Sequence, residues 1–203
     1  MILGITGGSG CGKTTLLRQV QALGGVVLDC DEIYHSLLST DEALLQAIEN
    51  RFPGTVSEGT LQRKKLGQLV FSDPQALEDL NRITHGAVKQ EVLRLLESKP
   101  ALPAIDAIGL FEGGLGELCD LTVAVTAPRE DRIRRLMARD SISREYAEKR
   151  LDAQPSDAWF REHCDFYLEN DGNLPDFQAE CLAFLRTHCI MKREFHEKGA
   201  RDI

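Results

Sequence analysis

The sequence contains no apolar run that approaches the length needed to cross a membrane, and it opens on a short apolar stretch without a basic leader. Its six cysteines include no Cys-x-x-Cys pair, so their spacing indicates neither a metal site nor a disulfide framework. The formal net charge of −8 argues against broad binding to nucleic acids or anionic membranes. We therefore expect a cytoplasmic protein with reduced thiols and no nucleic-acid or membrane partner.

The order of apolar and amphipathic segments along the 203 residues predicts one α/β domain. Short apolar strands are expected at residues 2–5, 26–28, 104–112, 121–126 and 165–169. Helical patterns lie at residues 13–23, 41–98, 129–139, 144–153 and 176–188, and the charged tail from residue 192 is expected to fray. Strands that alternate with helices favour a doubly wound, five-stranded parallel sheet flanked by helices.

A glycine-rich segment follows the first predicted strand: residues 7–14 read GGSGCGKT and match the spacing G-x-x-x-x-G-K-[ST]. Small residues let consecutive backbone N–H groups curl round a phosphate, and the dipole of the following helix favours the same anion. Lys13 is expected to reach the β- and γ-phosphates, and the Thr14 hydroxyl to ligate Mg²⁺. The sequence therefore predicts that the chain binds a nucleoside triphosphate.

Two aspartates close the second predicted strand, at Asp29 and Asp31. In an open parallel sheet, ligands gather at the carboxyl ends of the strands, where the phosphate loop also lies. We therefore expect a carboxylate beside the nucleotide, where it could activate the hydroxyl of an acceptor. Asp31 could instead serve as the N-cap of a helix.

Residues 41–98 form a helical stretch that is too long for a simple crossover between strands, which needs only one helix. Asp73 and Pro74 have the pattern of an N-cap followed by proline at the first helical position. We interpret this stretch as a helical subdomain that holds a second substrate, with a purely structural scaffold as the alternative.

Arginines recur at helical spacing in the later part of the chain. Arg132, Arg135 and Arg139 are expected to share one helical face. The planar guanidinium can bind two phosphate oxygens, so this face is typical of a lid that closes over a transferring phosphoryl group. A solvated face paired with acidic residues is the alternative. Because no N-K-x-D guanine signature is evident, these features favour a kinase over a GTPase.

Taken together, these motifs resemble those of the dephospho-coenzyme A kinase family over most of residues 1–172. The matching segments, with the family pattern after each, are TGGSGCGKT at 6–14 (TGGIGSGKS), VLDCD at 27–31 (VIDAD), EGTLQRKKL at 58–66 with VF at 70–71 (DGxLDRxxL…VF), DAIGLFE at 106–112 (DVPLLFE), RLMARD at 135–140 with Gln154 (the lid), and NDG at 170–172 (NxG). The ordered set is much more specific than any one of its motifs.

The resemblance implies transfer of the ATP γ-phosphoryl group to the ribose 3′-hydroxyl of dephospho-CoA, with ATP and Mg²⁺ as cofactors. Asp31 would position and deprotonate that hydroxyl, while Lys13, Arg135 and Arg139 would stabilise the transferring charge. The residues expected to hold the nucleotide are Gly10, Cys11, Gly12, Lys13, Thr14, Thr15 and Asn170, with Thr14 also on Mg²⁺. The residues expected to contact the acceptor are Asp31, His85 and Glu112, and Asp29 and Glu112 are also candidates to bind Mg²⁺-coordinated water.

Three positions depart from the family pattern. His85 is followed by Gly86 where the family usually has proline, and His85 is as readily a buried structural histidine as an acceptor contact. Ile108 and Gly109 replace Pro-Leu, which is expected to reshape the acceptor pocket. Cys11 lies within the phosphate loop, where oxidation of its thiol would affect activity.

The chain is expected to contain three regions with different functions. Residues 1–39, 100–128 and 164–203 would form the nucleotide-binding core, residues 40–99 the helical acceptor-binding insertion, and residues 129–163 the lid. Another small-molecule P-loop kinase, acting on a nucleoside or nucleotide, remains an alternative, as does a nucleotide-binding regulator that has lost turnover. The sequence does not set the oligomeric state.

Overall fold

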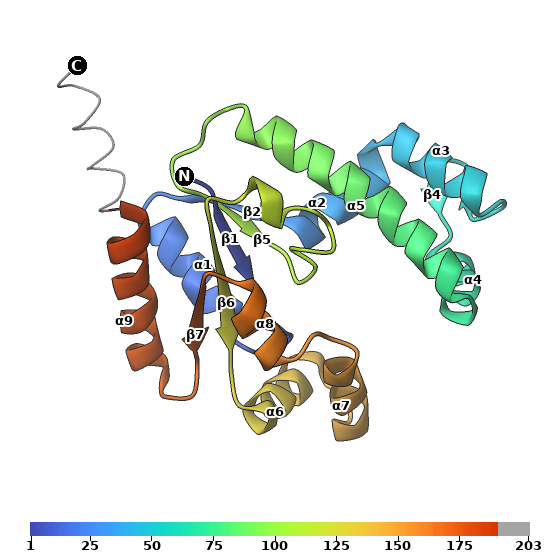
Figure 1. Ribbon diagram of the computed structural model, residues 1–203. Helices are drawn as coiled ribbons and strands as arrows, with labels where there is room; N and C mark the ends of the chain where they lie inside the picture. Colours follow the sequence, from blue (N-terminus) through green and yellow to red (C-terminus); the bar gives the residue numbers. More distant parts are fainter. Residues whose placement is uncertain (191–203) are drawn as a thin grey trace, which may run out of the picture.

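The computed structural model describes residues 1–190, and its centre is a five-stranded parallel sheet with strand order β2-β5-β1-β6-β7 (Figure 1). The strands are β1 (Leu3–Thr6), β2 (Val26–Asp29), β5 (Pro103–Asp106), β6 (Leu121–Thr126) and β7 (Phe166–Glu169). The central strands β1 and β6 are buried along their whole length, which explains their continuous apolar character. The predicted five-stranded parallel sheet is therefore confirmed.

The register of the sheet brings the carboxyl ends of three strands together. Asp29 at the end of β2 pairs with Asp106 at the end of β5. Asp106 in turn pairs with Ile5 of β1, one residue before the strand ends and the phosphate loop begins. Because parallel strands end at one edge of the sheet, residues far apart in the sequence meet there.

Helices cover both faces of the sheet. On one face, α1 (Lys13–Ala22) packs beside α9 (Leu174–Leu185), and their apolar side chains share a core with β1, β6 and β7. A single π-helical turn, Arg186–Ile190, continues α9. On the other face, α2 (Cys30–Thr40) and α5 (Pro74–Leu96) enclose a second core with β2 and β5. The predicted tail from residue 192 lies outside the described residues.

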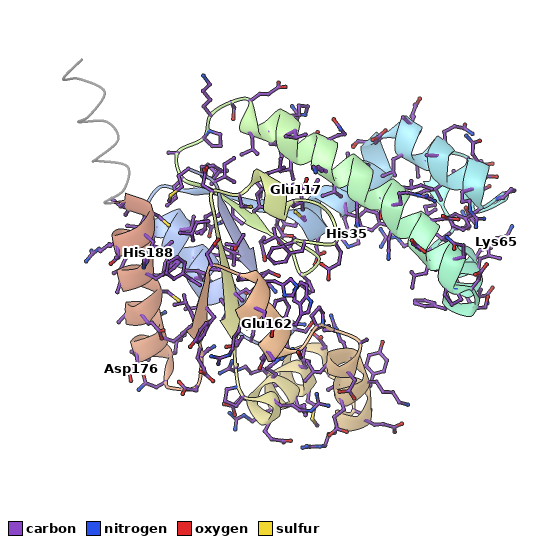
Figure 2. All side chains as sticks on the ribbon, in the orientation of Figure 1. His35, Lys65, Glu117, Glu162, Asp176 and His188 are labelled. Atoms are coloured by element: carbon purple, nitrogen blue, oxygen red, sulfur yellow. The ribbon has the colours of Figure 1, made fainter. Side chains whose placement is uncertain are left out.

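The helical insertion projects from this second face and has a core of its own (Figure 1). It contains α3 (Glu42–Arg51) and α4 (Arg63–Ser72), which pack against α5. The predicted start of α5 is confirmed, because the Asp73 side chain accepts a hydrogen bond from the Gln75 N–H at 2.9 Å and proline follows it. Figure 2 shows Lys65 at the outer end of the insertion and His35 near its junction with the sheet.

Two expectations for this region were incomplete. The helices begin earlier than residue 41, because Asp29 caps α2 directly at the end of β2. A short antiparallel hairpin, β3 (Val56–Ser57) and β4 (Thr60–Leu61), also separates α3 from α4. Its two-residue turn, Glu58 and Gly59, has positive φ angles of 52° and 72°, the conformation that matches the twist of a hairpin.

The expected strand at residues 104–112 was too long. Strand β5 ends at Asp106, and the Gly113 N–H donates to the carbonyl of Gly109 at 2.9 Å within the turn that follows. The physical reason is that both neighbouring strands end here, β1 at Thr6 and β2 at Asp29, so β5 has no strand left to pair with. A short 3₁₀ turn, η1 (Gly116–Leu118), then leads toward β6. The carboxylate that closes β5 is therefore Asp106 and not Glu112.

The lid region consists of α6 (Arg129–Asp140), α7 (Arg144–Asp152) and α8 (Asp157–His163), of which α8 was not expected from the sequence. Helices α6 and α7 share a small apolar core of Ile133, Leu136, Ala147 and Leu151. Across residues 1–190, no helix combines the length and apolar character needed to cross a membrane, and this holds for the 23-residue α5.

Candidate active site

The phosphate loop has the backbone conformation that its glycines predict. Gly7, Gly10 and Gly12 have φ angles of 132°, 77° and 102°, a region that favours glycine. A Cβ atom at Gly7 would also lie only 2.2 Å from the Val125 carbonyl oxygen. Helix α1 begins at Lys13 directly after Gly12, so its unpaired N-terminal N–H groups and its dipole are available to an anion.

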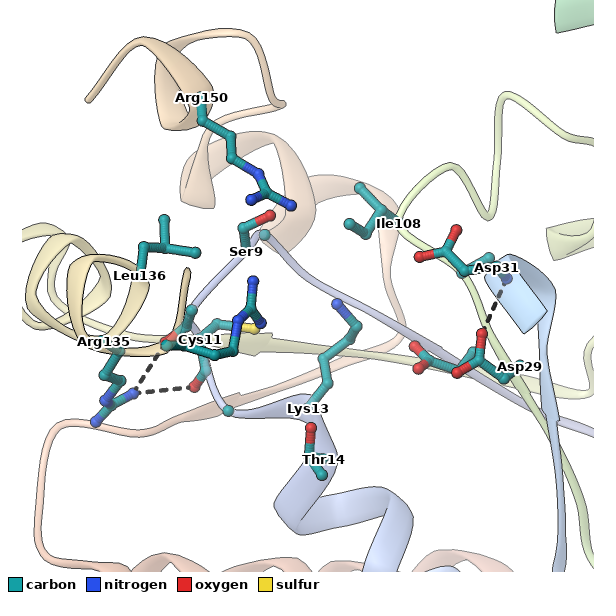
Figure 3. Close-up of a pocket in the computed structure, with 16 residues that line it drawn as sticks. Ser9, Cys11, Lys13, Thr14, Asp29, Asp31, Ile108, Arg135, Leu136 and Arg150 are labelled. Atoms are coloured by element: carbon teal, nitrogen blue, oxygen red, sulfur yellow. Dashed lines mark hydrogen bonds between the residues drawn. The ribbon is translucent and has the colours of Figure 1, made fainter. Parts of the chain in front are cut away.

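A cavity of about 350 Å³ lies between this loop, the ends of β2 and β5, and the lid (Figure 3). The predicted site residues that line it are Gly10, Cys11, Gly12, Lys13, Thr14, Asp31, Arg135 and Arg139. Thr15 is not part of the lining, and its N–H donates to the Gly12 carbonyl at 2.9 Å. The cavity therefore brings the predicted cation, hydroxyl and carboxylate groups to one place.

Lys13 extends from the start of α1 into this cavity, and Figure 3 shows its ammonium group between the loop and the aspartates. Its Nζ atom donates a hydrogen bond to the Gly7 carbonyl at 2.9 Å. Its positive charge also lowers the pKa of the Asp106 carboxyl, which opposes the effect of burial on that group. Lys13 is thus the cation that both the loop and the carboxylates face.

The two aspartates after β2 have different surroundings. Asp29 is the N-cap of α2, and its Oδ1 atom accepts from the N–H groups of Asp31 and Glu32 at 2.9 and 3.1 Å. The capping role considered for Asp31 therefore belongs to Asp29. Asp31 lies in the first turn of α2, is exposed, and lines the cavity (Figure 3). Its carboxylate is thus accessible to a substrate hydroxyl.

Asp106 is a third carboxylate in the cavity, and it was not among the predicted site residues. Burial raises its pKa to about 6, with further contributions from the negative charges of Asp29 and Asp31. Its Oδ1 atom is buried and has no hydrogen-bond partner within residues 1–190. The available sequence signal was its position at the end of a strand, which the overlong strand prediction concealed.

Replacing Asp106 with asparagine should stabilise the ligand-free protein at neutral pH. The pKa of the Asp106 carboxyl is higher in the folded protein than in the unfolded chain, so the folded protein favours the protonated form. The stability that depends on this protonated form is lost as the pH rises through about 6. A shift from 3.8 to about 6 corresponds to about 3 kcal/mol, which is an upper limit for the gain at pH 7.5. Urea unfolding at pH 5 and 7.5 should show a larger gain at pH 7.5, whereas an equal gain at both would contradict the assignment. The exposed residue Asp152 provides the matched control, Asp152→Asn.

The lid arginines divide into two groups. Arg135 and Arg139 line the cavity, whereas the buried Arg132 does not. Arg139 pairs with Asp140 at 2.6 Å, an exposed ion pair that costs little to open. Arg150 of α7 also lines the cavity and pairs with Asp140, and it was missed because no phosphate-loop motif points to it. The predicted three-arginine face therefore supplies two cavity arginines, and α7 supplies another.

Asn170 lies behind the loop. Its Nδ2 atom donates to the Cys11 carbonyl at 2.9 Å, and the residue is buried outside the cavity lining. A Cβ atom at Gly12 would lie 2.3 Å from the same Nδ2 atom, so the loop and Asn170 fit closely. Asn170 thus supports the loop backbone, and its contact with a nucleotide stays a prediction.

A second cavity, of about 270 Å³, opens beside the first, between α2, α5 and the turn after β5. Asp31, Ala107 and Ile108 line both cavities. The other residues of its lining are Cys30, Tyr34, Leu80, Asn81, Thr84, His85, Val88, Gly109, Gly113 and Leu115. His85 and the two departures at positions 108 and 109 therefore lie in this cavity. Glu112 is exposed and lines neither of them.

The Cys11 thiol should react slowly with alkylating reagents in the folded protein. Cys11 is 1% exposed, and burial raises the pKa of its thiol, so little nucleophilic thiolate is available. The structure therefore argues against the expected sensitivity of this residue to oxidation. Mass spectrometry after iodoacetamide treatment should show labelling of Cys11 at least roughly tenfold slower than in urea-unfolded protein. Equal labelling rates in the two states would contradict this.

Known proteins match the chain over nearly its whole length. The family profile described as dephospho-CoA kinase matches residues 1–176. The dephospho-CoA kinase of Latilactobacillus sakei is 33% identical, covering 92% of this chain and 95% of the relative. A Thermus thermophilus crystal structure aligns with a TM-score of 0.78 at 34% identity, covering 93% and 97% of the two chains. The dephospho-CoA kinase structure from Campylobacter jejuni gives a TM-score of 0.65 at 26% identity, covering 91% and 95%. The chain belongs to the dephospho-CoA kinase family.

Proposed function

We propose that this kinase transfers the γ-phosphoryl group of ATP to the ribose 3′-hydroxyl of dephospho-CoA, giving coenzyme A and ADP. The observation that carries the proposal is that Asp31 lines both cavities. A nucleotide on the phosphate loop and an acceptor in the second cavity would then meet at this carboxylate. The family membership supports the identity of the acceptor.

The residues of the first cavity support phosphoryl transfer by positioning and electrostatics, without a covalent enzyme intermediate. The loop N–H groups from Gly10 to Thr14 would hold the phosphates. Lys13, Arg135 and Arg139 would neutralise charge on the transferring group, and the Arg139–Asp140 pair is exposed enough to rearrange. Asp31 would accept the proton of the acceptor hydroxyl as the new bond to phosphorus forms.

The cavity also suits Mg²⁺. The buried Oδ1 atom of Asp106 has no partner in the described part of the chain, and the Thr14 hydroxyl lines the same cavity. No cluster of three or more His, Cys, Asp or Glu side chains in residues 1–190 is arranged to hold a metal by itself. This fits an ion that binds through few protein groups together with substrate phosphates and water. Thr14, with Asp29 and Asp106 through water, would hold the ion, which would neutralise phosphate charge.

We assign three functions to the parts of the chain predicted above. The insertion at residues 40–99 would bind the acceptor, supported by the position of His85 in the second cavity. Residues 129–163 would act as the lid, supported by Arg135, Arg139 and Arg150 around the first cavity. The rest would bind the nucleotide. Cytoplasmic location stays a prediction of the sequence.

The decisive assay measures ADP release from ATP and Mg²⁺ with dephospho-CoA, beside a panel of nucleosides and nucleotides, and the mass of each product. A gain of one phosphate on dephospho-CoA alone is expected. ADP release only with another acceptor would favour the nucleoside or nucleotide kinase and refute the acceptor assignment. ATP binding without turnover on any acceptor would favour the regulator instead.

A further inference from the structure

The lid region holds all three polar groups of Ser9, a residue of the phosphate loop that is only 6% exposed. The Gln154 Oε1 atom accepts from the Ser9 N–H at 2.8 Å, and the Gln154 Nε2 atom donates to the Ser9 Oγ at 2.8 Å. The Arg132 Nε atom donates to the Ser9 carbonyl at 3.0 Å. Arg132 comes from α6, and Gln154 from the loop between α7 and α8. The contacts therefore join two separate parts of the lid to one residue of the loop.

The Arg132 side chain is buried and makes contacts beyond the one to Ser9. It is 6% exposed and pairs with Asp157, the first residue of α8, at 3.0 Å. Its guanidinium lies directly against the loop, because a Cβ atom at Gly8 would fall 2.0 Å from its Nη2 atom. A buried arginine whose donors are used in this way is not available to a phosphate. Arg132 therefore differs from Arg139, which lies on the same helix, lines the first cavity and pairs with Asp140.

The same pattern continues along the loop. The Arg135 Nη1 atom donates to the carbonyls of Gly10 and Cys11 at 3.2 and 3.3 Å, and Asn170 donates to the Cys11 carbonyl as well. Three successive carbonyls, those of Ser9, Gly10 and Cys11, thus accept from groups around the loop. In a trans peptide unit the N–H of the next residue points the opposite way from the carbonyl. Arg132 holds the Ser9 carbonyl, and Arg135 and Asn170 hold the Cys11 carbonyl. The N–H groups of Gly10 and Gly12 therefore point away from these three side chains.

We propose that Gln154 and Arg132 are positioning residues that keep the phosphate loop in its anion-binding conformation while the lid helices are docked on it. This inference rests on the proposed function in one respect, that the loop binds ATP, and it does not depend on which acceptor is used. Coupling of this kind is reciprocal, so a phosphate bound in the loop also stabilises the docked lid. Neither residue touches the reacting atoms, and both act through the backbone of the loop.

The test replaces Gln154 and measures the binding of Mg·ADP by calorimetry, together with the KM for ATP, the KM for dephospho-CoA and kcat. Gln154→Met has a similar volume and removes both hydrogen bonds to Ser9, together with the longer one that Gln154 Oε1 accepts from Arg132 Nη2 at 3.4 Å. Loss of the two bonds to Ser9 should raise the Kd for Mg·ADP and the KM for ATP about tenfold. Ser9→Ala removes only the Oγ bond and should give about a threefold rise in both. Gln154→Glu can accept from both the Ser9 N–H and its hydroxyl, so it should restore binding to within about threefold of the natural chain.

The matched control is Gln46→Met, the same substitution at an exposed site in α3, which should leave every value unchanged. A KM for dephospho-CoA that stays constant while ATP binding weakens supports the positioning role. The proposal is overturned if Gln154→Met lowers the melting temperature but leaves the Kd for Mg·ADP unchanged. It is also overturned if Gln154→Glu fails to restore the binding of Mg·ADP. The binding of Mg·ADP needs no acceptor. If dephospho-CoA is not a substrate of the natural chain, that result would therefore refute the proposed function but not the positioning role of Gln154 and Arg132.

Discussion

The Asp31→Asn variant should bind ATP normally and lose at least about 10²-fold in turnover, the usual scale for a positioned general base. Asparagine keeps the size and the hydrogen-bonding shape of aspartate but cannot take a proton from the acceptor hydroxyl. The phosphate loop and Lys13 remain intact in this variant, and Asp29, which caps α2, is untouched. The loss should therefore fall on kcat, with the Kd for Mg·ADP unchanged.

Asp31 is distinguished from the other two carboxylates by its position. Asp29 and Asp106 line only the first cavity, whereas Asp31 borders both. Glu32→Gln is the matched control, because Glu32 is exposed in the same helical turn and lines neither cavity. Calorimetry with Mg·ADP and steady-state kinetics with both substrates separate binding from turnover. Near-normal turnover of Asp31→Asn would refute the assignment of Asp31 as the base.

Lys13→Ala should weaken nucleotide binding and slow transfer together, with a loss of about 10²–10³-fold in kcat/KM for ATP, the scale for one electrostatic contact to developing charge. Lys13 lines the first cavity, where it would face the β- and γ-phosphates, and its charge lowers the pKa of the Asp106 carboxyl. Without it, three carboxylates would repel the phosphates with less compensation. Both the Kd for Mg·ADP and kcat should therefore change.

The control for this variant is Lys149→Ala, since Lys149 is exposed in α7 and pairs with Glu145, which is also exposed. Lys149→Ala should match the natural chain in both measurements. If Lys13→Ala binds Mg·ADP as tightly as the natural chain, Lys13 does not contact the phosphates. If it binds weakly but turns over normally at saturating ATP, Lys13 contributes to binding alone.

Much of the nucleotide site could be read directly from the sequence, because its signals are local. The spacing of Gly7, Gly12, Lys13 and Thr14 defines a strand, a loop and a helix within a few residues, and the structure has these elements at the predicted positions. The N-cap at Asp73 and the strand β6 at residues 121–126 were likewise confirmed, because capping residues and buried apolar runs depend on near neighbours. The sequence by itself therefore determined the fold class and the location of the phosphate loop.

The tertiary structure alone decided which distant residues meet that loop. Asp106 is a site carboxylate only because β5 lies between β2 and β1 and ends level with Asp29. Arg132 and Arg135 carry the same charge on the same helix, yet Arg132 is buried against Ser9 while Arg135 reaches the cavity. Helical spacing predicts on which face of a helix a side chain lies, but it does not predict what that face packs against. That surface is set by strand order and by the docking of one element on another, which depend on contacts between residues more than a hundred positions apart.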